Sequence, residues 1–247
     1  MQLNQIFNID CMDFMQSMPY NCIDLILTDP PYGITQCKWD VETNLDKLWK
    51  NFNKIIKSKS AIVMFASQPF SSKLVCSNIK KFKYEWIWNK KLAGNPLNAK
   101  RAPLKTHESI MVFNFHDYYP IMTQGELKTK GGPGKRSEIF GKADAQYKIK
   151  NDLYYPKSIL DQDLFSLGNR NKKDLYHPTQ KPLDLIKYLI LTYSKERDTV
   201  FDPFMGSGTT AVACKELNRN FIGCEIEAKY CKIAEKRLKE TVKALIL

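Results

Sequence analysis

Long apolar segments are absent from this 247-residue sequence, whose longest apolar run falls far short of the about 20 residues that a bilayer span needs. Residues 1–10 are polar and lack the basic segment followed by an apolar one that marks a secretory signal. The sequence therefore argues against an integral membrane protein. We expect a cytoplasmic protein without a membrane partner.

Histidines and paired cysteine motifs are also scarce. The three histidines and seven cysteines form no C-x-x-C pair and show no spacing typical of a zinc site. An odd number of unpaired cysteines favours reduced thiols that pack in the interior, as is usual in the cytosol. We therefore expect no bound metal ion and no disulfide framework.

Basic residues, in contrast, are abundant. Lysine and arginine number 38 against 26 aspartates and glutamates, which gives a net charge of +12. Such an excess attracts a polyanion, so nucleic acid is the first candidate partner and an anionic membrane surface the second. The length suits one large domain, or one domain that carries an insertion.

Short apolar runs bounded by turn residues alternate with amphipathic segments along much of the chain. The runs do not alternate strictly with polar residues, which is typical of strands buried on both faces of a parallel sheet. Strand–helix alternation then predicts an α/β fold with right-handed crossovers. We expect strands at 22–27, 61–65, 199–201 and 220–224, and helices at 45–56, 182–193 and 229–243.

Residues from about 90 to 176 break this alternation. The segment contains a Gly-Gly-Pro-Gly turn at 131–134, and between Lys128 and Lys150 seven basic residues stand against two acidic ones. One interpretation is an inserted subdomain whose basic side chains neutralise phosphates. The other is a solvated loop whose lysines only favour solubility.

The first chemically informative motif is Thr28-Asp-Pro-Pro-Tyr-Gly33, at the end of a predicted buried strand. Its two prolines stiffen the chain where a parallel sheet presents residues at its carboxyl edge. Asp29 offers acceptor oxygens, Pro30 a carbonyl, and Tyr32 an aromatic face. Together they suit a planar ring that carries an amine; the alternative is a rigid turn without a function.

The second motif is the glycine-rich turn Asp-Pro-Phe-Met-Gly-Ser-Gly-Thr-Thr at 202–210, before a helix that begins near Thr209. Its glycines let the backbone approach a ligand, and a helix N-terminus favours a polar or negative group. The turn lacks the lysine of a phosphate-binding loop and the third glycine of the dinucleotide fingerprint. Glu225 follows about 20 residues later, where an acid can bind a ribose diol; the alternative is a surface acid.

The order of these features along the chain is the most specific signal. With Asp-Pro-Pro-Tyr first, a basic variable region next and the glycine-rich turn last, the chain resembles the β class of amino-DNA methyltransferases that use S-adenosylmethionine. The resemblance extends over about 1–115 and 174–242, and includes His177-Pro-Thr-Gln-Lys-Pro182, Trp86-Ile-Trp-Asn-Lys90 and His107-Glu108.

The resemblance implies a Rossmann-like methyltransferase sheet, mostly parallel and in permuted strand order. It places the catalytic domain at 1–115 and 174–247, and a target-recognition insertion at 116–173 or from about 90. It also implies the transfer of a methyl group from S-adenosylmethionine to the exocyclic amine of a base flipped out of double-stranded DNA.

The resemblance also implies a role for individual residues. The expected catalytic residues are Asp29, Pro30, Pro31 and Tyr32. The expected cofactor contacts are Asp10, Cys11, Asp29, Thr179, Gln180, Lys181, Asp202, Phe204, Gly206, Ser207, Gly208, Thr209 and Glu225. The candidate DNA contacts are Asn95, Lys100, Arg101, Lys128, Lys135, Arg136 and Lys142. Asp10 also suits the N-cap of a helix at 12–18.

Aspartate at position 29 indicates adenine N6 as the target, because cytosine-N4 members of the family commonly carry serine there. The alternatives are cytosine N4, an RNA base, a protein glutamine, an inactive DNA-binding homologue and, last, a dinucleotide-dependent oxidoreductase. The resemblance also allows a homodimer and a cognate restriction endonuclease as partners.

Overall fold

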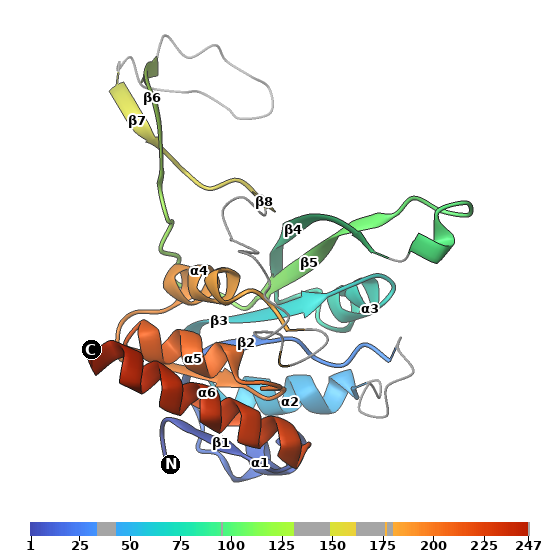
Figure 1. The fold of residues 1–247 in the computed structure, drawn as a ribbon, viewed down its shortest axis with the longest axis vertical. Helices are drawn as coiled ribbons and strands as arrows, with labels where there is room; N and C mark the ends of the chain where they lie inside the picture. The colour runs from blue at the N-terminus through green and yellow to red at the C-terminus, as the bar shows by residue number, and fades with distance from the viewer. Residues whose placement is uncertain (34–42, 95, 131–148, 162–175, 177–179, 247) are drawn as a thin grey trace. The chain divides into compact units, whose positions relative to one another are not determined.

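A computed structural model describes residues 1–33, 43–94, 96–130, 149–161, 176 and 180–246. These residues form two compact units, one made of Met1–Tyr119 and Ser158–Leu247 and the other of Pro120–Lys157. The first unit contains the central sheet and the site described below (Figure 1).

The central sheet of the first unit has eight strands in the order β1-β10-β9-β2-β3-β5-β4-β8. They are β1 (Gln5–Phe7), β2 (Ile23–Thr28), β3 (Ile56–Ala66), β4 (Phe82–Gly94), β5 (Lys105–Phe113), β8 (Ile159–Asp161), β9 (Thr199–Asp202) and β10 (Asn220–Cys224). Within the described residues every pair is parallel except β3–β5 and β5–β4. The predicted α/β fold with a mostly parallel sheet is confirmed.

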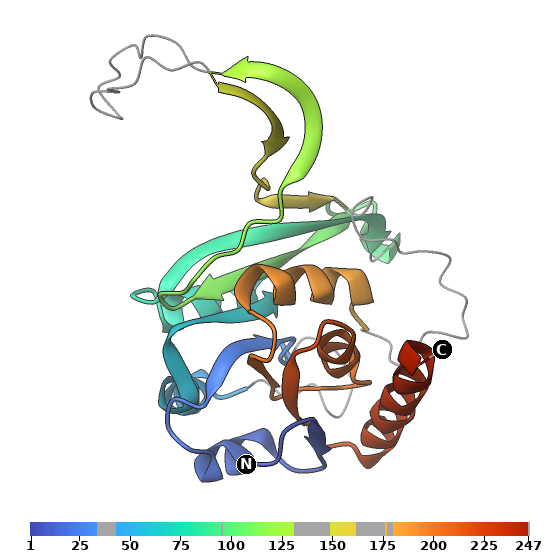
Figure 2. The same cartoon turned by 90° about the vertical axis from the view of Figure 1, so that its left-hand side faces the viewer.

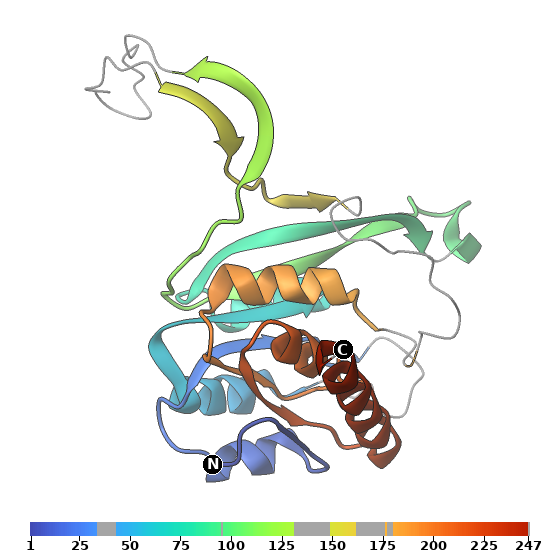
Figure 3. The same ribbon diagram turned by 60° about the vertical axis from the view of Figure 1, so that its left-hand side comes forward.

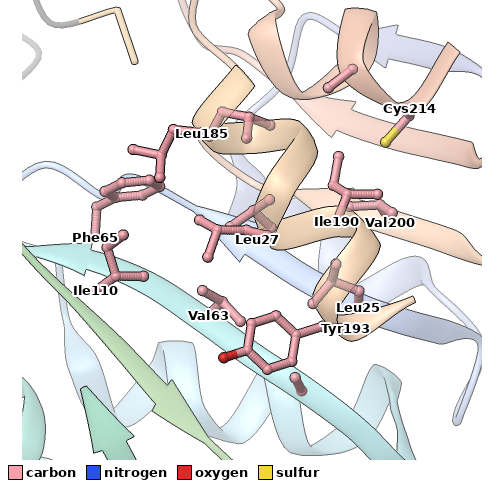
Figure 4. Close-up of a cluster of buried hydrophobic side chains, with 14 of the residues drawn as sticks. Leu25, Leu27, Val63, Phe65, Ile110, Leu185, Ile190, Tyr193, Val200 and Cys214 are labelled. Atoms are coloured by element: carbon pink, nitrogen blue, oxygen red, sulfur yellow. The ribbon is translucent and has the colours of Figure 1, made fainter. Parts of the chain in front are cut away.

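Helices cover both faces of this sheet (Figures 2 and 3). They are α1 (Cys11–Ser17), α2 (Leu45–Ile55), α3 (Phe70–Ser77), α4 (Leu183–Tyr193), α5 (Thr209–Glu216) and α6 (Ala228–Ile246), with a short 3-10 turn η1 (Pro96–Asn98). Buried side chains of α4 and α5 pack with Leu25, Leu27 and Val63 on one face (Figure 4). Those of α1, α2 and α3 pack with Ile26 and Ile62 on the other.

Helix α2 shows how the sequence produces these elements. The side chain of Asn44 caps it by accepting a hydrogen bond from Lys47 N at 3.0 Å. Leu48, Phe52 and Ile55 recur at helical spacing and are fully buried against the sheet. Truncating a core phenylalanine such as Phe52 costs about 3–5 kcal/mol, so this apolar face fixes the helix on the sheet.

The expected strands and helices are present, with β3 beginning five residues earlier than expected, and the structure contains further strands, of which β4 and β5 are the longest in the central sheet. Residues 82–94 and 105–113 form an antiparallel pair, β4 and β5, that extends the sheet beyond β3. Phe82, Tyr84 and Trp86 alternate with Lys83 and Glu85, which is a strand signal of period two. The interruption predicted from about residue 90 therefore begins inside a strand of the central sheet.

The second unit is a two-stranded antiparallel ribbon of β6 (Thr123–Lys130) and β7 (Ile149–Tyr154). The Tyr154 hydroxyl donates to the carbonyl of Glu126 at 2.8 Å, and Gln124 Nε2 donates to Asp152 at 2.8 Å. The ribbon lies within the insertion predicted at 116–173, whereas β8, also within that range, pairs with β4 of the central sheet.

Three negative observations concern the described residues only. No helix among them is both long and apolar enough to cross a bilayer. Their six cysteines are all free thiols, and four of these, Cys11, Cys214, Cys224 and Cys231, are buried. Nor do the described histidine, cysteine and acidic side chains form a group of three or more suited to a metal ion.

Candidate active site

The two predicted motifs end on neighbouring parallel strands. β2 pairs with β9, with Leu25 opposite Val200 and Ile26 opposite Phe201, so both strands point their carboxyl ends to the same edge of the sheet. Asp29 follows β2 directly, and Asp202 is the last residue of β9. This edge is where open α/β sheets bind their ligands.

Asp29 is partly exposed and is held by Tyr32 of its own motif. The Tyr32 hydroxyl donates a hydrogen bond to Asp29 Oδ1 at 2.5 Å. The Tyr32 ring stacks on Phe70, with ring centroids 5.0 Å apart and planes inclined by 24°. Phe70 begins α3 and is buried. The sequence interpretation did not include Phe70, which supports one face of the predicted stacking residue.

The second oxygen of Asp29 faces Lys181, which was expected to contact the cofactor. Lys181 Nζ donates to Asp29 Oδ2 and lies 3.3 Å from Glu108 Oε2. Its cation also lies over the ring of Phe65, 5.0 Å from the centroid. Burial by itself lowers the pKa of Lys181, but the two carboxylates outweigh burial and raise that pKa above its ordinary value. Lys181 is therefore a permanent cation.

Glu108 connects this cation to the β4–β5 pair. Its Oε1 accepts a hydrogen bond from Lys90 Nζ at 2.7 Å, so Glu108 lies between two ammonium groups. Burial opposes its ionisation, yet Lys181 and Lys90 together lower the pKa of Glu108. The nearby Lys105 donates to Ser67 Oγ, and burial lowers the pKa of Lys105. Glu108 and Lys90 had no predicted role beyond their place in the resemblance.

The glycine turn has the backbone that its sequence predicts. Gly206 and Gly208 have φ of +55° and +84°, a region that favours glycine. A Cβ at Gly208 would lie 2.6 Å from the Cβ of Ala234 on α6, so only glycine fits where this helix approaches. Arg237 of α6 donates to the carbonyl of Ser207 at 2.6 Å and thereby holds the turn.

Glu225 lies against this turn. Its Oε2 accepts a hydrogen bond from Gly206 N at 2.8 Å, and its Oε1 accepts one from Glu227 N at 2.8 Å. Burial raises the pKa of Glu225 above its ordinary value. Gln180 reaches the turn from the other side, because its Oε1 accepts a hydrogen bond from Ser207 Oγ at 3.2 Å. The structure thus brings Gln180, Ser207, Gly206 and Glu225 together.

Asp202 has a different environment from the other acids of the site. It is only 4% exposed, and its oxygens accept from Thr28 Oγ1 at 2.7 Å, Thr210 Oγ1 at 2.6 Å and Phe204 N at 3.1 Å. Burial raises the pKa of Asp202 to about 6. These bonds tie β2, β9 and α5 to one another, so Asp202 organises the turn from beneath.

At the edge of the site, Asp10 caps α1. Its Oδ1 accepts hydrogen bonds from Met12 N at 2.7 Å and Asp13 N at 3.3 Å, which is the capping role that its sequence position suggested. Burial and the adjacent Asp10 carboxylate raise the pKa of the neighbouring Cys11 thiol to about 12. The Cys11 thiol is therefore uncharged at neutral pH.

The candidate DNA contacts are only partly described. Lys100 and Arg101 are exposed in the turn after η1. Lys128 belongs to the ribbon unit and forms an exposed ion pair with Glu126 at 3.2 Å. Four of the candidates, Asn95, Lys135, Arg136 and Lys142, lie outside the described residues, as does the candidate cofactor contact Thr179.

The glycine turn follows β9, and Glu225 follows the neighbouring parallel strand β10. This arrangement is typical of α/β proteins that bind a nucleoside. The chain also matches the model of a DNA methylase family, N6_N4_Mtase, over residues 23–236. It therefore belongs to this family, the amino-DNA methyltransferases, as the motif order indicated.

Individual relatives match this chain over differing shares of its length. The Type II methyltransferase M1.MboII of Moraxella bovis is 28% identical over 253 residues, which is 93% of this chain and 94% of that one. M2.DpnII of Streptococcus pneumoniae is 56% identical over 94 residues, 38% of this chain and 35% of that one.

Solved structures show the same likeness. The M1.HpyAVI–SAM complex has a TM-score of 0.63 at 26% identity and covers 95% of this chain and 98% of that one. The cytosine-N4-specific PvuII DNA methyltransferase has a TM-score of 0.67 at 15% identity, over 96% of this chain and 89% of that one. This second likeness concerns the fold alone.

Proposed function

We propose that this chain transfers a methyl group from S-adenosylmethionine to the N6 amine of an adenine flipped out of duplex DNA. The observation that carries the proposal is the Asp29 carboxylate, held by Tyr32 on the strand next to the one that leads into the glycine turn. Aspartate at this position favours adenine, since the cytosine-N4 members of the family commonly carry serine there.

The glycine turn and its surroundings fit S-adenosylmethionine. When bound, this cofactor supplies an electrophilic methyl group on a sulfonium. Each oxygen of Glu225 accepts one backbone N–H, which leaves lone pairs for the two ribose hydroxyls. The space beside Gly206 is open, because a Cβ built there would lie more than 4 Å from the other described atoms compared with it. A ligand can therefore approach the backbone of Gly206 closely. Phe204 is partly exposed beside the turn and offers an apolar surface.

The Asp29 motif performs the activation of the target amine. That nitrogen is a weak nucleophile because its lone pair is delocalised into the ring. Hydrogen bonds from its two N–H groups to Asp29 and to the Pro30 carbonyl let the nitrogen become pyramidal, which localises the lone pair for in-line attack. One N–C bond would form as the bond between the methyl group and the sulfonium sulfur breaks, which would leave a neutral thioether. The nitrogen would gain a positive charge and release one proton, and Asp29 would accept it.

Flipping the target base out of the duplex costs a few kcal/mol. Stacking on an aromatic ring returns about 1–3 kcal/mol. Tyr32 supplies this ring, and its packing on Phe70 fixes the plane in which the base lies.

A basic segment beside the site is suited to hold the duplex. From Lys90 to Lys105 the chain has five basic residues and no acidic one, and Leu97 at its centre is 92% exposed. Exposed Lys100 and Arg101 neutralise phosphates next to the extruded base. A homodimer and an endonuclease partner stay predictions of the sequence.

The test uses purified protein, S-adenosylmethionine with an isotope-labelled methyl group, and unmethylated duplex DNA. The DNA is digested to nucleosides, and the labelled nucleoside is identified by mass spectrometry. We expect labelled N6-methyladenine from the wild type and none from Asp29→Ala. Labelled N4-methylcytosine would keep the enzyme class but contradict the choice of adenine. Label in RNA alone would contradict the DNA substrate.

A further inference from the structure

Lys181 is the least exposed of the three charged side chains that meet beside Asp29, and the mechanism above gives it no role. Its side chain is 10% exposed, against 25% for Asp29 and 18% for Glu108, and it lies between these two carboxylates. Buried ion pairs are weak sources of stability, since apolar residues of similar volume often serve equally well. A role in stability alone therefore does not account for this cation.

The pair formed by Asp29 and Lys181 has a definite hydrogen-bonding pattern. An ionised carboxylate only accepts hydrogen bonds, and an ammonium group only donates them. The two groups touch, so they present an acceptor and a donor side by side. Each carboxylate oxygen has two lone pairs, so Asp29 can accept a further N–H while it keeps Tyr32 and Lys181.

The Watson–Crick edges of the bases either match or oppose this pattern. Adenine presents its amine beside the unprotonated ring nitrogen N1, and cytosine presents its amine beside N3, so each offers a donor next to an acceptor. Guanine and thymine present a carbonyl oxygen beside a ring N–H, which is the reverse order. Enzymes that flip a base read this edge by hydrogen bonds.

We propose that Lys181 donates a hydrogen bond to the ring nitrogen beside the target amine, and that it thereby selects adenine or cytosine over guanine and thymine. Asp29 accepts from the amine at the same time. Glu108 is a positioning residue in this arrangement, because it holds Lys181 from the side opposite Asp29, and Lys90 holds Glu108.

This division of labour follows from the chemistry of the ring. A hydrogen bond donated to the ring nitrogen draws electron density away from the amine and makes the amine a weaker nucleophile. Lys181 therefore contributes recognition and Asp29 contributes activation. The same donor fits adenine N1 and cytosine N3, which explains how one scaffold can serve N6 and N4 chemistry. The inference rests on the proposed function and adds a specificity residue to it.

The experiment compares DNA duplexes in which the target adenine is replaced by 1-deazaadenine or by 7-deazaadenine. The first analogue keeps the amine but has C–H in place of N1; the second keeps both. We expect kcat/KM of the wild type to fall roughly tenfold to a hundredfold with 1-deazaadenine, the usual effect of losing a hydrogen bond to a charged group. With 7-deazaadenine we expect a change of less than about threefold.

Two properties of 1-deazaadenine act against the expected loss. Its amine is the stronger nucleophile, and its pairing with thymine is weaker, so both properties by themselves raise the rate of transfer. A fall in kcat/KM therefore reports the missing contact to N1. If labelling identifies cytosine as the target, 3-deazacytosine takes the place of 1-deazaadenine.

The variant Lys181→Met removes the donor. Its kcat/KM on adenine is expected to be low. Its kcat/KM on 1-deazaadenine is expected to be less than about threefold lower still, because the two changes delete the same hydrogen bond. Lys90→Met is the matched control, because it removes one lysine from Glu108 and leaves Lys181 in place. The fall in kcat/KM from adenine to 1-deazaadenine is expected to be as large in this variant as in the wild type. If Lys181→Met does not fold, Glu108→Gln, which loosens Lys181, is expected to shrink that effect.

The outcomes separate the two proposals. A wild type that transfers no methyl group to any duplex overturns the proposed function. A wild type that methylates adenine and 1-deazaadenine equally well overturns only the role of Lys181. The same holds if Lys181→Met is folded and retains the full sensitivity to 1-deazaadenine.

Discussion

Asp29 and Asp202 have nearly the same local sequence and quite different environments. Each stands at the carboxyl end of a buried parallel strand, and each precedes a proline. The oxygens of Asp29 are met by a tyrosine hydroxyl and a lysine, and a quarter of its side chain is exposed. The oxygens of Asp202 are met by two threonine hydroxyls and a backbone N–H in the interior.

The difference shows that an Asp-Pro pair at the end of a strand predicts where the aspartate lies in the fold, but does not predict its function. The two threonines around Asp202 are supplied by β2 and α5, and one of them, Thr28, directly precedes Asp29. Thr28 therefore connects Asp202, which supports the site, to Asp29, for which we propose the catalytic role. Substitutions at the two positions are expected to separate activity from stability.

The largest effect is expected from Asp29→Asn, which keeps the shape and removes the charge. Single-turnover methyl transfer is expected to fall about 10²–10³-fold, because the amine loses its charged acceptor. The free energy of unfolding is expected to fall by about 1–2 kcal/mol, because the buried Lys181 loses one carboxylate partner and keeps Glu108 as the other. Quenched-flow transfer assays and urea unfolding measure the two quantities. A rate within tenfold of the wild type would exclude the activating role.

Asp202→Ala is expected to have the opposite profile. Three buried donors lose their acceptor, which destabilises the fold by roughly 2–4 kcal/mol. Urea unfolding of the free protein measures this loss, and Thr210→Val, which removes only one of the three donors, is the graded control. A loss below about 1 kcal/mol for Asp202→Ala would contradict the supporting role of Asp202.

The same residue predicts a pH dependence. The pKa of Asp202 is raised from 3.8 to about 6 by burial, so the folded state favours the protonated form. Its contribution to stability is therefore complete below about pH 4 and is lost as the pH rises through about 6. Relative to Asp202→Asn, the free energy of unfolding of the wild type is expected to fall by up to about 3 kcal/mol across this window. A difference that is flat with pH would contradict the raised pKa.

The smallest effect is expected from a double substitution that touches neither aspartate. Lys100→Ala with Arg101→Ala removes two exposed charges beside the site, which is expected to weaken DNA binding and reduce its salt slope by up to about 2. Methyl transfer at saturating DNA stays near wild type. Lys47→Ala with Lys50→Ala, which removes the same charge from the exposed side of α2, is the control. An unchanged slope would exclude these DNA contacts.

Much of the fold could be predicted from the sequence because parallel strands are apolar on both faces and leave a strong local signal. The positions of Asp29, Tyr32, Gly206, Gly208 and Glu225 followed from where those strands end. Such signals are local, so they can be recognised without knowing how the rest of the chain folds.

Contacts between distant segments could not be predicted in this way. Lys181 meets Asp29 across 152 residues of sequence, and Glu108 joins them from β5, where it stands opposite the buried Trp88 of β4. Phe70 and Arg237 reach the site from helices that carry no motif. The internal role of Asp202 depends on two hydroxyls supplied by other elements, and its own neighbours in sequence do not reveal it.

The pairing of β2 with β9 has a consequence for how such a chain can change. A slip of one residue between these strands would shift Asp29 by about 3.3 Å and turn its side chain to the opposite face. In the proposed reaction, the pairing of β2 with β9 therefore sets the distance between the methyl donor and the target amine, and the ribbon at Pro120–Lys157 has no part in this pairing. If the ribbon reads the DNA sequence, as we propose, a chimaera that carries another ribbon between β5 and β8 is expected to keep the methyl-transfer reaction and to change its DNA sequence specificity.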